Sequence, residues 1–282
     1  MLECVVNVSE GRRRDVVAAI AGTAGACLLD VHSDAHHHRS VLTLAGEGAG
    51  VEEAAGAVAV AAVEVVDLSA HTGAHPRLGS VDVVPFVPLE GSTMADAVAA
   101  RGRFAAWAST TLGLPCFLYG PERSLPDVRR RAFRGLEPDA GPRVPHPTAG
   151  AVCVGARPVL VAYNVWLAQG TSVARAKEVA RAVRGPALRA LGLDVGGRAQ
   201  VAMNLVDPLV VGPDRAYDQV ARLAPVERAE LVGLVPEAVL AAVAPERWRE
   251  LDLDGSRTIE ARLAARRVLP PHPHGPAACQ TA

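Results

Sequence analysis

Residues 67–89 read Asp-Leu-Ser-Ala-His-Thr-Gly-Ala-His-Pro-Arg-Leu-Gly-Ser-Val-Asp-Val-Val-Pro-Phe-Val-Pro-Leu, and they separate an Ala- and Val-rich helical segment from an apolar strand. His71 and His75 are four apart, but Gly73 lies between them and Pro76 follows, and both residue types oppose helix. The stretch therefore predicts a loop with two histidines, not a helical zinc pair. An imidazole with an ordinary pKa of about 6.5 suits proton transfer near neutral pH. A turn with a solvated histidine is the alternative.

The segments around this loop follow the order strand, helix, strand, strand, helix, strand. In chain order we expect them at 3–8, 12–24, 26–32, 39–45, 51–68 and 81–88. This order is typical of a ferredoxin-like α+β fold, in which helices cover one face of a mainly antiparallel sheet. The polar loop 33–38, with three consecutive histidines, and the loop 69–80 are expected to converge at one end of that sheet.

The rest of the chain predicts a second, similar unit. Three further elements, at about 92–112, 115–119 and 124–134, extend the first half. Residues 136–149 are rich in Pro and Gly, so we place the division into domains there, at 1–140 and 141–269, with a disordered tail at 270–282.

Alternating apolar and polar segments continue after that division. The expected elements are a hairpin of 150–154 and 158–166 that turns at Gly155-Ala-Arg157, a helix at 171–191, a strand at 201–206, a helix at 214–223, a run at 228–234 and a helix from Pro236. They resemble a second α/β half.

The composition limits the classes of function. The net charge is −1, from 29 basic and 30 acidic residues, so no general attraction to nucleic acid or to an anionic membrane is implied. Any anionic ligand must be held by locally placed arginines. The N-terminus has no basic region followed by an apolar core, and the five cysteines lack paired spacing. We therefore expect a cytoplasmic protein with buried free thiols.

Several ordered motifs share one likeness. They are Glu3-Cys-Val-Val-Asn-Val-Ser-Glu-Gly11, Leu28-Leu-Asp-Val31, Arg39-Ser-Val41, His71 to Phe86, Tyr119-Gly120, Gly141 to Gly150, Gly155-Ala-Arg157, Ala162-Tyr-Asn164, Asn204-Leu-Val-Asp207 and Glu230 to Pro236. Together they resemble the formiminotransferase family over roughly residues 3–245.

The resemblance implies a fold and an activity. It implies two ferredoxin-like subdomains packed around a folate site, and a homodimer. The implied reaction moves a formimino group from N-formimino-L-glutamate to N5 of tetrahydrofolate, in histidine catabolism and one-carbon metabolism, with tetrahydrofolate as co-substrate and no metal. In mammalian relatives a cyclodeaminase domain follows on the same chain, so here we expect a separate cyclodeaminase as a partner.

The resemblance also assigns residues. His75 falls on the family's catalytic histidine, and one imidazole can take a proton from the attacking amine and return it to the leaving nitrogen. His71 has either a direct chemical role or an orienting one. Arg39 and Arg77 are candidates for substrate carboxylates, since a guanidinium gives a bidentate match, with surface ion pairs as the alternative. Asp82 either orients His75 or caps the loop.

Folate contacts are implied for two further groups of residues. The first is the ten-residue segment that otherwise reads as an interdomain linker: Gly141, Pro142, Arg143, Val144, Pro145, His146, Pro147, Thr148, Ala149 and Gly150. The second is Asn164 and Asn204, at strand positions, which are expected to bond the pterin ring. Buried asparagines that satisfy nearby backbone are the alternative.

Four positions depart from the family's pattern. His38, which we count among the binding residues, replaces the usual Asn before Arg39, and Trp166 replaces the second Asn of an Asn-x-Asn motif. Ala74 replaces an acidic residue. His32 stands where relatives have a second aspartate, so that Asp34 or no residue supplies a carboxylate to His75.

These departures keep other functions in view. One is a formimidoyltransferase with a different donor or acceptor, and another is a folate-binding protein without catalysis. A third is a metal-dependent hydrolase with zinc held by ligands of the right type, although no spacing fits a known site: Asp34, His36, His37, His38, His71 and His75.

Overall fold

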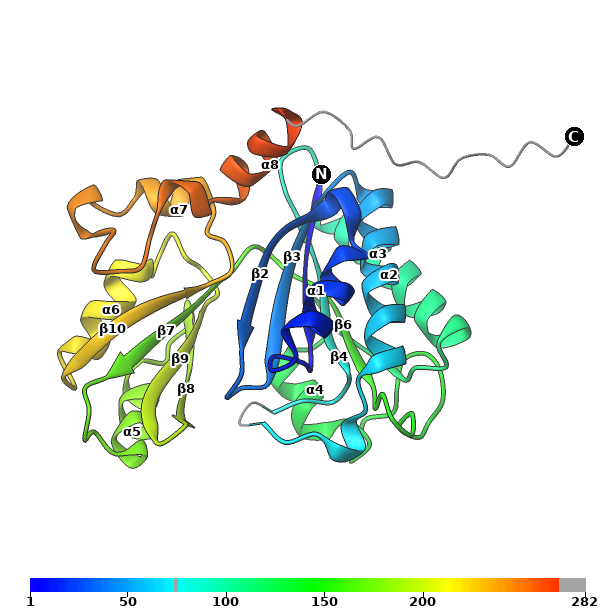
Figure 1. Cartoon of the computed structure of the whole chain (residues 1–282), viewed down its shortest axis with the longest axis horizontal. Coiled ribbons are helices and arrows are strands. Elements are labelled where there is room, and N and C mark those ends of the chain that lie inside the picture. The colour runs from blue at the N-terminus through cyan, green and yellow to red at the C-terminus, as the bar shows by residue number, and fades with distance from the viewer. Residues whose placement is uncertain (74–75, 269–282) are drawn as a thin grey trace, which may run out of the picture.

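The computed structural model describes residues 1–73 and 76–268, with the backbone alone at 267 and 268. Two lobes lie side by side, each built on one sheet whose longer helices cover its outer face (Figure 1). Each lobe contains the order strand, helix, strand, strand, helix, strand. The predicted α+β class with two ferredoxin-like subdomains is therefore confirmed.

The N-terminal lobe has a six-stranded sheet of order β2-β3-β1-β4-β6-β5. Its elements are β1 (Leu2–Val8), α1 (Arg14–Gly22), η1 (Gly25–Cys27), β2 (Leu28–Asp34), β3 (Arg39–Gly46), α2 (Gly48–Val65), η2 (Leu68–Ala70), β4 (Val81–Pro88), α3 (Met94–Thr111), β5 (Cys116–Tyr119), α4 (Leu125–Arg131) and β6 (Val152–Ala156). β1 pairs antiparallel with both β3 and β4, and β6 adds to the sheet parallel to β4 and β5.

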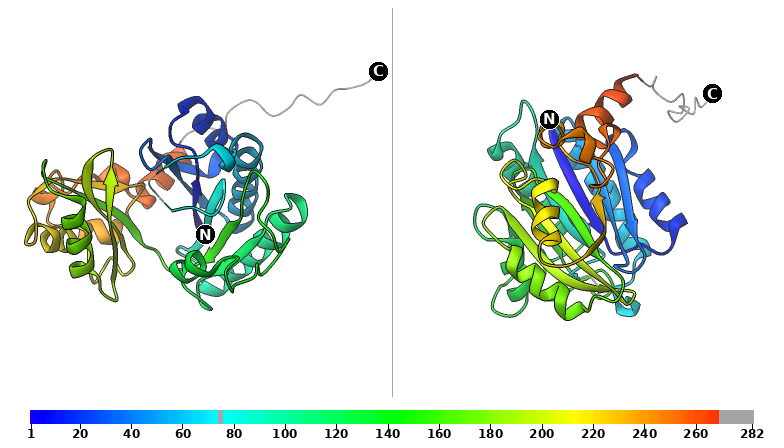
Figure 2. Two further views of the ribbon diagram at one scale, coloured as in Figure 1. Left: turned by 90° about the horizontal axis from the view of Figure 1, so that it is seen from below. Right: turned by 90° about the vertical axis from the view of Figure 1, so that its left-hand side faces the viewer.

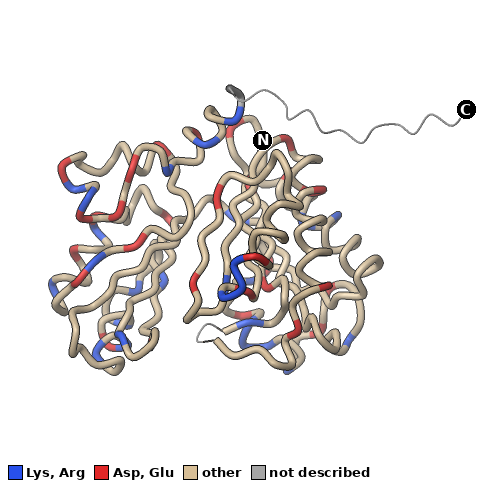
Figure 3. Tube along the Cα trace, in the orientation of Figure 1, with Lys and Arg blue, Asp and Glu red and all other residues tan. Residues whose placement is uncertain are grey.

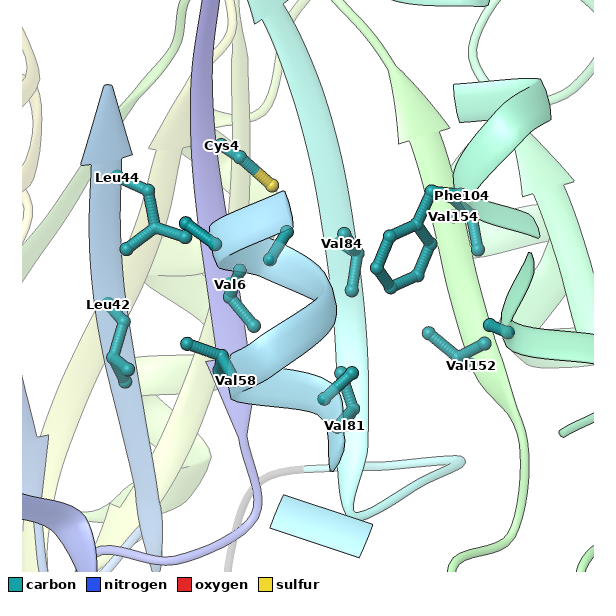
Figure 4. Close-up of a cluster of buried hydrophobic side chains, with 14 of the residues drawn as sticks. Cys4, Val6, Leu42, Leu44, Val58, Val81, Val84, Phe104, Val152 and Val154 are labelled. Carbon is teal, nitrogen blue, oxygen red and sulfur yellow. The ribbon is translucent and has the colours of Figure 1, made fainter. Parts of the chain in front are cut away.

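Alternation along β1 decides which side chains meet the core. Cys4 and Val6 are fully buried and point toward α2, where Val58 meets them (Figure 4). Because successive residues of a strand point to opposite faces, Glu3, Val5 and Asn7 face away from the helices. Helix α2 therefore leaves the other face of the sheet open around β1, while Val128 of α4 packs on that face against Val83 and Cys153.

The C-terminal lobe has a four-stranded antiparallel sheet of order β10-β7-β9-β8. Its elements are β7 (Val161–Leu167), α5 (Val173–Val183), β8 (Leu188–Val195), β9 (Arg198–Leu205), α6 (Pro213–Ala221) and β10 (Val226–Val232), followed by α7 (Glu237–Ala241), η3 (Pro245–Arg247), η4 (Gly255–Arg257) and α8 (Ile259–Val268). This lobe buries its own apolar cluster, which includes Tyr163 and Leu231.

Helix α8 connects the lobes a second time. It lies between them when the molecule is seen from below (Figure 2, left). Ile259 packs in a small apolar cluster with Leu29 and Leu234, and Val159 of the first connection packs against the same cluster. An ion pair of 3.8 Å joins Arg262 to Asp30. Both connections between the lobes therefore lie at one place.

Three boundary predictions need correction. The helix expected at 171–191 ends at Val183, because Gly185-Pro186 breaks it, and Leu188–Val195 is strand β8. The expected hairpin around 155–157 does not form, since β6 and β7 belong to different sheets.

The change of lobe follows β6 and so comes later than the expected division between 140 and 141. The Pro- and Gly-rich segment marks irregular backbone inside the first lobe, where Cys116 and Ala140 form a bridge. The tail 270–282 lies outside the described residues.

Charge and cysteine placement agree with the sequence. Basic and acidic positions are interspersed over both lobes (Figure 3). The four cysteines in the described part of the chain are free; Cys4, Cys116 and Cys153 are buried and Cys27 is partly buried. Among the described residues, no helix has the length and apolar character needed to cross a membrane.

Candidate active site

The two polar loops meet at one end of the N-terminal sheet. Arg77 lies on the loop after α2 and reaches the turn between β2 and β3, where its Nη1 donates to the carbonyl of His38 at 3.1 Å and its Nη2 to that of His37 at 3.0 Å. The rings of His38 and His71 lie with their centroids 4.0 Å apart and are tilted by 31°. The predicted convergence is confirmed. His75 and Ala74 lie outside the described residues.

Arg77 ties the loops together instead of presenting a bare guanidinium. Besides the two carbonyls, its Nη1 lies 2.8 Å from His71 Nε2. Burial and the nearby positive charge of Arg77 lower the pKa of His71, so that this ring is mainly neutral at pH 7. These contacts favour an orienting role for His71, and the use of Arg77 as a carboxylate ligand stays a prediction.

His38, which replaces the usual Asn of the family, has a structural role in a left-handed backbone conformation. Its φ is 51°, in the left-handed region that Asn adopts most readily among larger residues. Its Nδ1 accepts a hydrogen bond from the backbone N–H of Gly11 at 3.2 Å, so this nitrogen carries no proton. Burial, followed by the positive charge of His71, lowers the pKa of His38 to about 4.

The low pKa of His38 makes stability depend on pH. The unfolded chain takes up a proton near pH 6.5 and the folded chain only near 4, so stability is complete above pH 6.5 and falls as the pH drops through this window. The side-chain oxygen of Asn can also accept from Gly11, but it takes up no proton in this range. When the pH falls from 7 to 5, we therefore expect the free energy of unfolding of His38→Asn to drop by on the order of 1–2 kcal/mol less than that of the wild type. Urea unfolding at both pH values measures this difference, and parallel losses in the two proteins contradict it.

The buried carboxylate of Asp82 holds the end of the histidine loop that follows α2. Asp82 is 1% exposed, and its oxygens accept from the backbone N–H of Leu78 at 2.7 Å and from Arg129 Nη2 at 2.6 Å. Arg129 also donates to the carbonyl of Pro76 at 2.9 Å. Of the two roles predicted for Asp82, these contacts are those of a loop cap.

Arg39 lies at the edge of this cluster. It donates to the side-chain oxygen of Asn7, at 2.8 Å from its Nε, and its Nη1 lies 3.9 Å from Asp82. Burial lowers the pKa of Arg39 to about 10, which leaves it charged at neutral pH. The sequence did not predict Asn7 and Arg129 as site residues, although Asn7 lies in the motif Glu3 to Gly11 and Arg129 in the expected element 124–134.

A cleft of about 720 Å³ separates the inner faces of the two sheets. Its walls include apolar side chains such as Val5, Val41, Leu188 and Met203. Six arginines line it, at positions 39, 129, 130, 157, 184 and 189, against the two carboxylates of Glu3 and Asp34. Asp82 and Asp127, which are not lining residues, pair with Arg129 and Arg130, and the remaining arginines favour a ligand with negative groups.

The two predicted asparagines both line the cleft from the C-terminal sheet. Asn164 Nδ2 donates to Glu230 Oε2 at 3.2 Å, and Trp166 Nε1 donates to the same oxygen at 2.8 Å. From the other lobe, His32 Nε2 lies 3.7 Å from Glu230 Oε1. Two departures from the family's pattern, His32 and Trp166, therefore meet at one carboxylate, which sequence reasoning missed.

The segment from Gly141 to Gly150 is not among the residues that line this cleft. It braces the histidine loop instead: the N–H of Leu68 donates to the carbonyl of Thr148 at 2.8 Å, and that of Ser80 to the carbonyl of Ala149 at 2.9 Å. Folate binding by this segment stays a prediction.

The alternative of a metal-dependent hydrolase requires a cluster of metal ligands. In the described part of the chain, no three His, Cys, Asp or Glu side chains gather around a possible ion. Asp34 Oδ1 instead accepts from the backbone N–H groups of His36 and His37, each at 2.7 Å. His36 reaches across to the C-terminal lobe, where a Cβ on Gly196 would lie 2.6 Å from its Nε2.

An apolar cleft with surplus arginines and histidine loops at one end defines a protein that binds small anionic molecules. Residues 1–157 match the formiminotransferase domain, N-terminal subdomain. The chain belongs to the formiminotransferase family.

Named relatives agree with this assignment. Glutamate formimidoyltransferase of Streptococcus pyogenes serotype M1 is 36% identical, in an alignment that covers 92% of this chain and 97% of that protein. Glutamate formimidoyltransferase of Thermoplasma acidophilum is also 36% identical, with 93% and 97% covered. Formimidoyltransferase-cyclodeaminase of Sus scrofa is 36% identical over 86% of this chain but only 52% of its own length, so the chain spans about half of that relative.

Proposed function

We propose that the protein transfers the formimino group of N-formimino-L-glutamate to N5 of tetrahydrofolate. The observation that carries this proposal is the arginine-lined cleft, because both substrates bear carboxylates and the folate also has a planar ring that suits apolar walls. Its volume of about 720 Å³ is typical of sites for molecules of this size. The names of the two prokaryotic relatives support glutamate as the donor's amino acid.

The reaction needs one group that moves a proton. N5 of the folate attacks the formimino carbon, a new N–C bond forms, and the bond from that carbon to the glutamate nitrogen breaks. N5 loses a proton and the leaving nitrogen gains one, so a single imidazole that accepts and then returns it balances the exchange. We assign this role to His75 from its motif. Its described neighbours in sequence, His71 and Arg77, lie where the loops meet at the end of the cleft-facing sheet.

The test is a direct transfer assay. Purified protein is mixed with tetrahydrofolate and N-formimino-L-glutamate, quenched in acid and read as methenyl-tetrahydrofolate absorbance. We expect signal in the wild type and a loss of roughly 10²- to 10⁴-fold in His75→Ala, the usual contribution of a general acid–base group. Full activity in His75→Ala removes this assignment, and a wild type that binds tetrahydrofolate without transferring anything favours a non-catalytic folate-binding protein.

A second candidate is transfer from a different N-formimino donor. The contacts of Glu230 with His32 and Trp166 favour it, because they change the polarity beside the cleft, which His32 lines, at positions where the family's pattern has Asp and Asn. A panel of N-formimino amino acids in the same assay distinguishes the two, since the glutamate derivative must give the highest kcat/KM if it is the donor.

The setting of the protein is part of the same proposal. A cytoplasmic location and a homodimer rest on the composition and on the family resemblance. A separate cyclodeaminase as partner is supported by the formimidoyltransferase-cyclodeaminase of Sus scrofa, whose name places the two activities on one chain.

A further inference from the structure

Glu3 is a buried acid on the floor of the cleft. It is 4% exposed and belongs to the cleft-lining residues. It lies in β1 between Ala45 of β3 and Val87 of β4, so apolar residues flank it on both sides in the sheet. A charged side chain in such surroundings is stable only with a partner.

No partner for Glu3 is present within the described part of the chain. No group there donates a hydrogen bond to its carboxylate, and the positive charge of Arg157 acts on it without forming an ion pair. Burial, opposed by Arg157 and reinforced by Glu260, raises the pKa of Glu3 to about 7. A strand position that carries this cost and opens into the cleft is suited to a ligand that supplies the missing donors.

The chemistry of the carboxylate limits the ligand. Two oxygens in one plane match a group with two adjacent N–H donors, as a guanidinium or an aminopyrimidine presents them. In the proposed reaction, the 2-amino-4-oxopyrimidine edge of the folate has this arrangement, with a ring N–H beside the exocyclic amino group. Tyr119 and Pro85 line the same cleft and can cover the faces of a planar ring.

The position of Glu3 along β1 agrees with this orientation. Asn7 lies on the same face four residues later, which is about 13 Å along a strand. Asn7 holds Arg39 at the end of the sheet where the histidine loops meet. A bicyclic ring with one hydrogen bond at each end spans a distance of this order, so its pyrimidine edge and its reacting nitrogen would face opposite ends of the strand.

We propose that Glu3 binds the 2-amino-4-oxopyrimidine edge of the folate co-substrate and thereby points N5 toward the histidine loops. This inference rests on the proposed function. Glu3 is a binding and positioning residue that takes no proton from the reacting atoms. Nothing in this role involves the formimino donor.

The experiment measures KM for each substrate and Kd for tetrahydrofolate in Glu3→Gln. Glutamine keeps the shape but replaces one acceptor with a donor. We expect KM and Kd for tetrahydrofolate to rise roughly 10- to 100-fold, the effect of losing charge-assisted hydrogen bonds, with KM for N-formimino-L-glutamate unchanged. Glu64→Gln, on the exposed face of α2, is the matched control and should equal the wild type.

A folate analogue in which methyl replaces the 2-amino group gives the decisive comparison. Glu3→Gln should weaken its binding less than that of tetrahydrofolate, because one of the two donors that Glu3 holds is already missing. Equal weakening of tetrahydrofolate and the analogue by Glu3→Gln overturns the proposal, as does an unchanged Kd for tetrahydrofolate or a rise confined to the formimino donor. A wild type without transfer activity contradicts the proposed function alone, since the two Kd comparisons still test Glu3.

Discussion

Replacing Asp82 with alanine is expected to lower the free energy of unfolding by about 3–5 kcal/mol, the usual effect of removing one partner from a buried ion pair. Asp82 is 1% exposed, and its removal leaves the N–H of Leu78 without an acceptor and Arg129 without its buried counterion. Arg39 loses a nearby negative charge as well. Urea unfolding followed by circular dichroism measures the change.

Asp139 provides a control of similar chemistry in a wetter place. It also accepts from a backbone N–H, that of Leu118 at 2.8 Å, and forms a two-pronged ion pair with Arg123. Its side chain is 22% exposed, against 2% for Asp82. We expect Asp139→Ala to lower the free energy of unfolding by about 1–2 kcal/mol, because water can replace part of the hydrogen bonding that the carboxylate provided. Equal losses in the two variants would show that burial of Asp82 does not decide the effect.

The second large effect is expected at Gly150, where the segment 141–150 meets the histidine loop. Its φ is +70°, and an added Cβ would lie 2.1 Å from the carbonyl oxygen of Leu78 and 2.9 Å from Leu68 Cδ1. Left-handed backbone alone costs a larger residue about 1–2 kcal/mol, and overpacking adds about 1–3. We therefore expect Gly150→Ala to lower the free energy of unfolding by about 3 kcal/mol and to reduce transfer activity.

Gly135 separates the two contributions to that loss. Its φ is +94°, but no heavy atom lies within 4 Å of an added Cβ. Gly135→Ala should therefore show the backbone cost alone, with transfer activity retained. If Gly150→Ala is no less stable than Gly135→Ala, close contact at position 150 does not add to the loss of stability, and the prediction is wrong.

The first lobe could be predicted from sequence because its signals are local. Alternation in residues 2–8 and the Ala- and Val-rich run after Gly48 each depend on a few neighbouring residues. Strand β8 was missed because Arg189 and Leu191 suit a helix as well as a strand, and Gly185-Pro186 was not read as a break. The place of β6 beside β4 depends on pairing between distant segments, which no local pattern encodes.

The site was predictable only in part for the same reason. The family resemblance followed from the motifs, and the meeting of the two loops followed from the order of elements. The use of each charge did not, because Asp82 meets Arg129 across 47 residues and Glu230 meets His32 across the two lobes. Glu3 was quoted in a motif, yet only the structure shows that its side chain is buried in the cleft without a donor.

The two connections between the lobes have a mechanical consequence. Val159 and α8 meet in the cluster around Ile259, so they act as one pivot, while His36 touches the turn at Gly196 at the far end. In a pair of tongs joined at a single pivot, a small rotation changes the gap least near the joint and most at the tips. Here the tips carry the histidine turn, so an opening that admits substrate widens the cleft most at the histidine loops and least at the floor around Glu3.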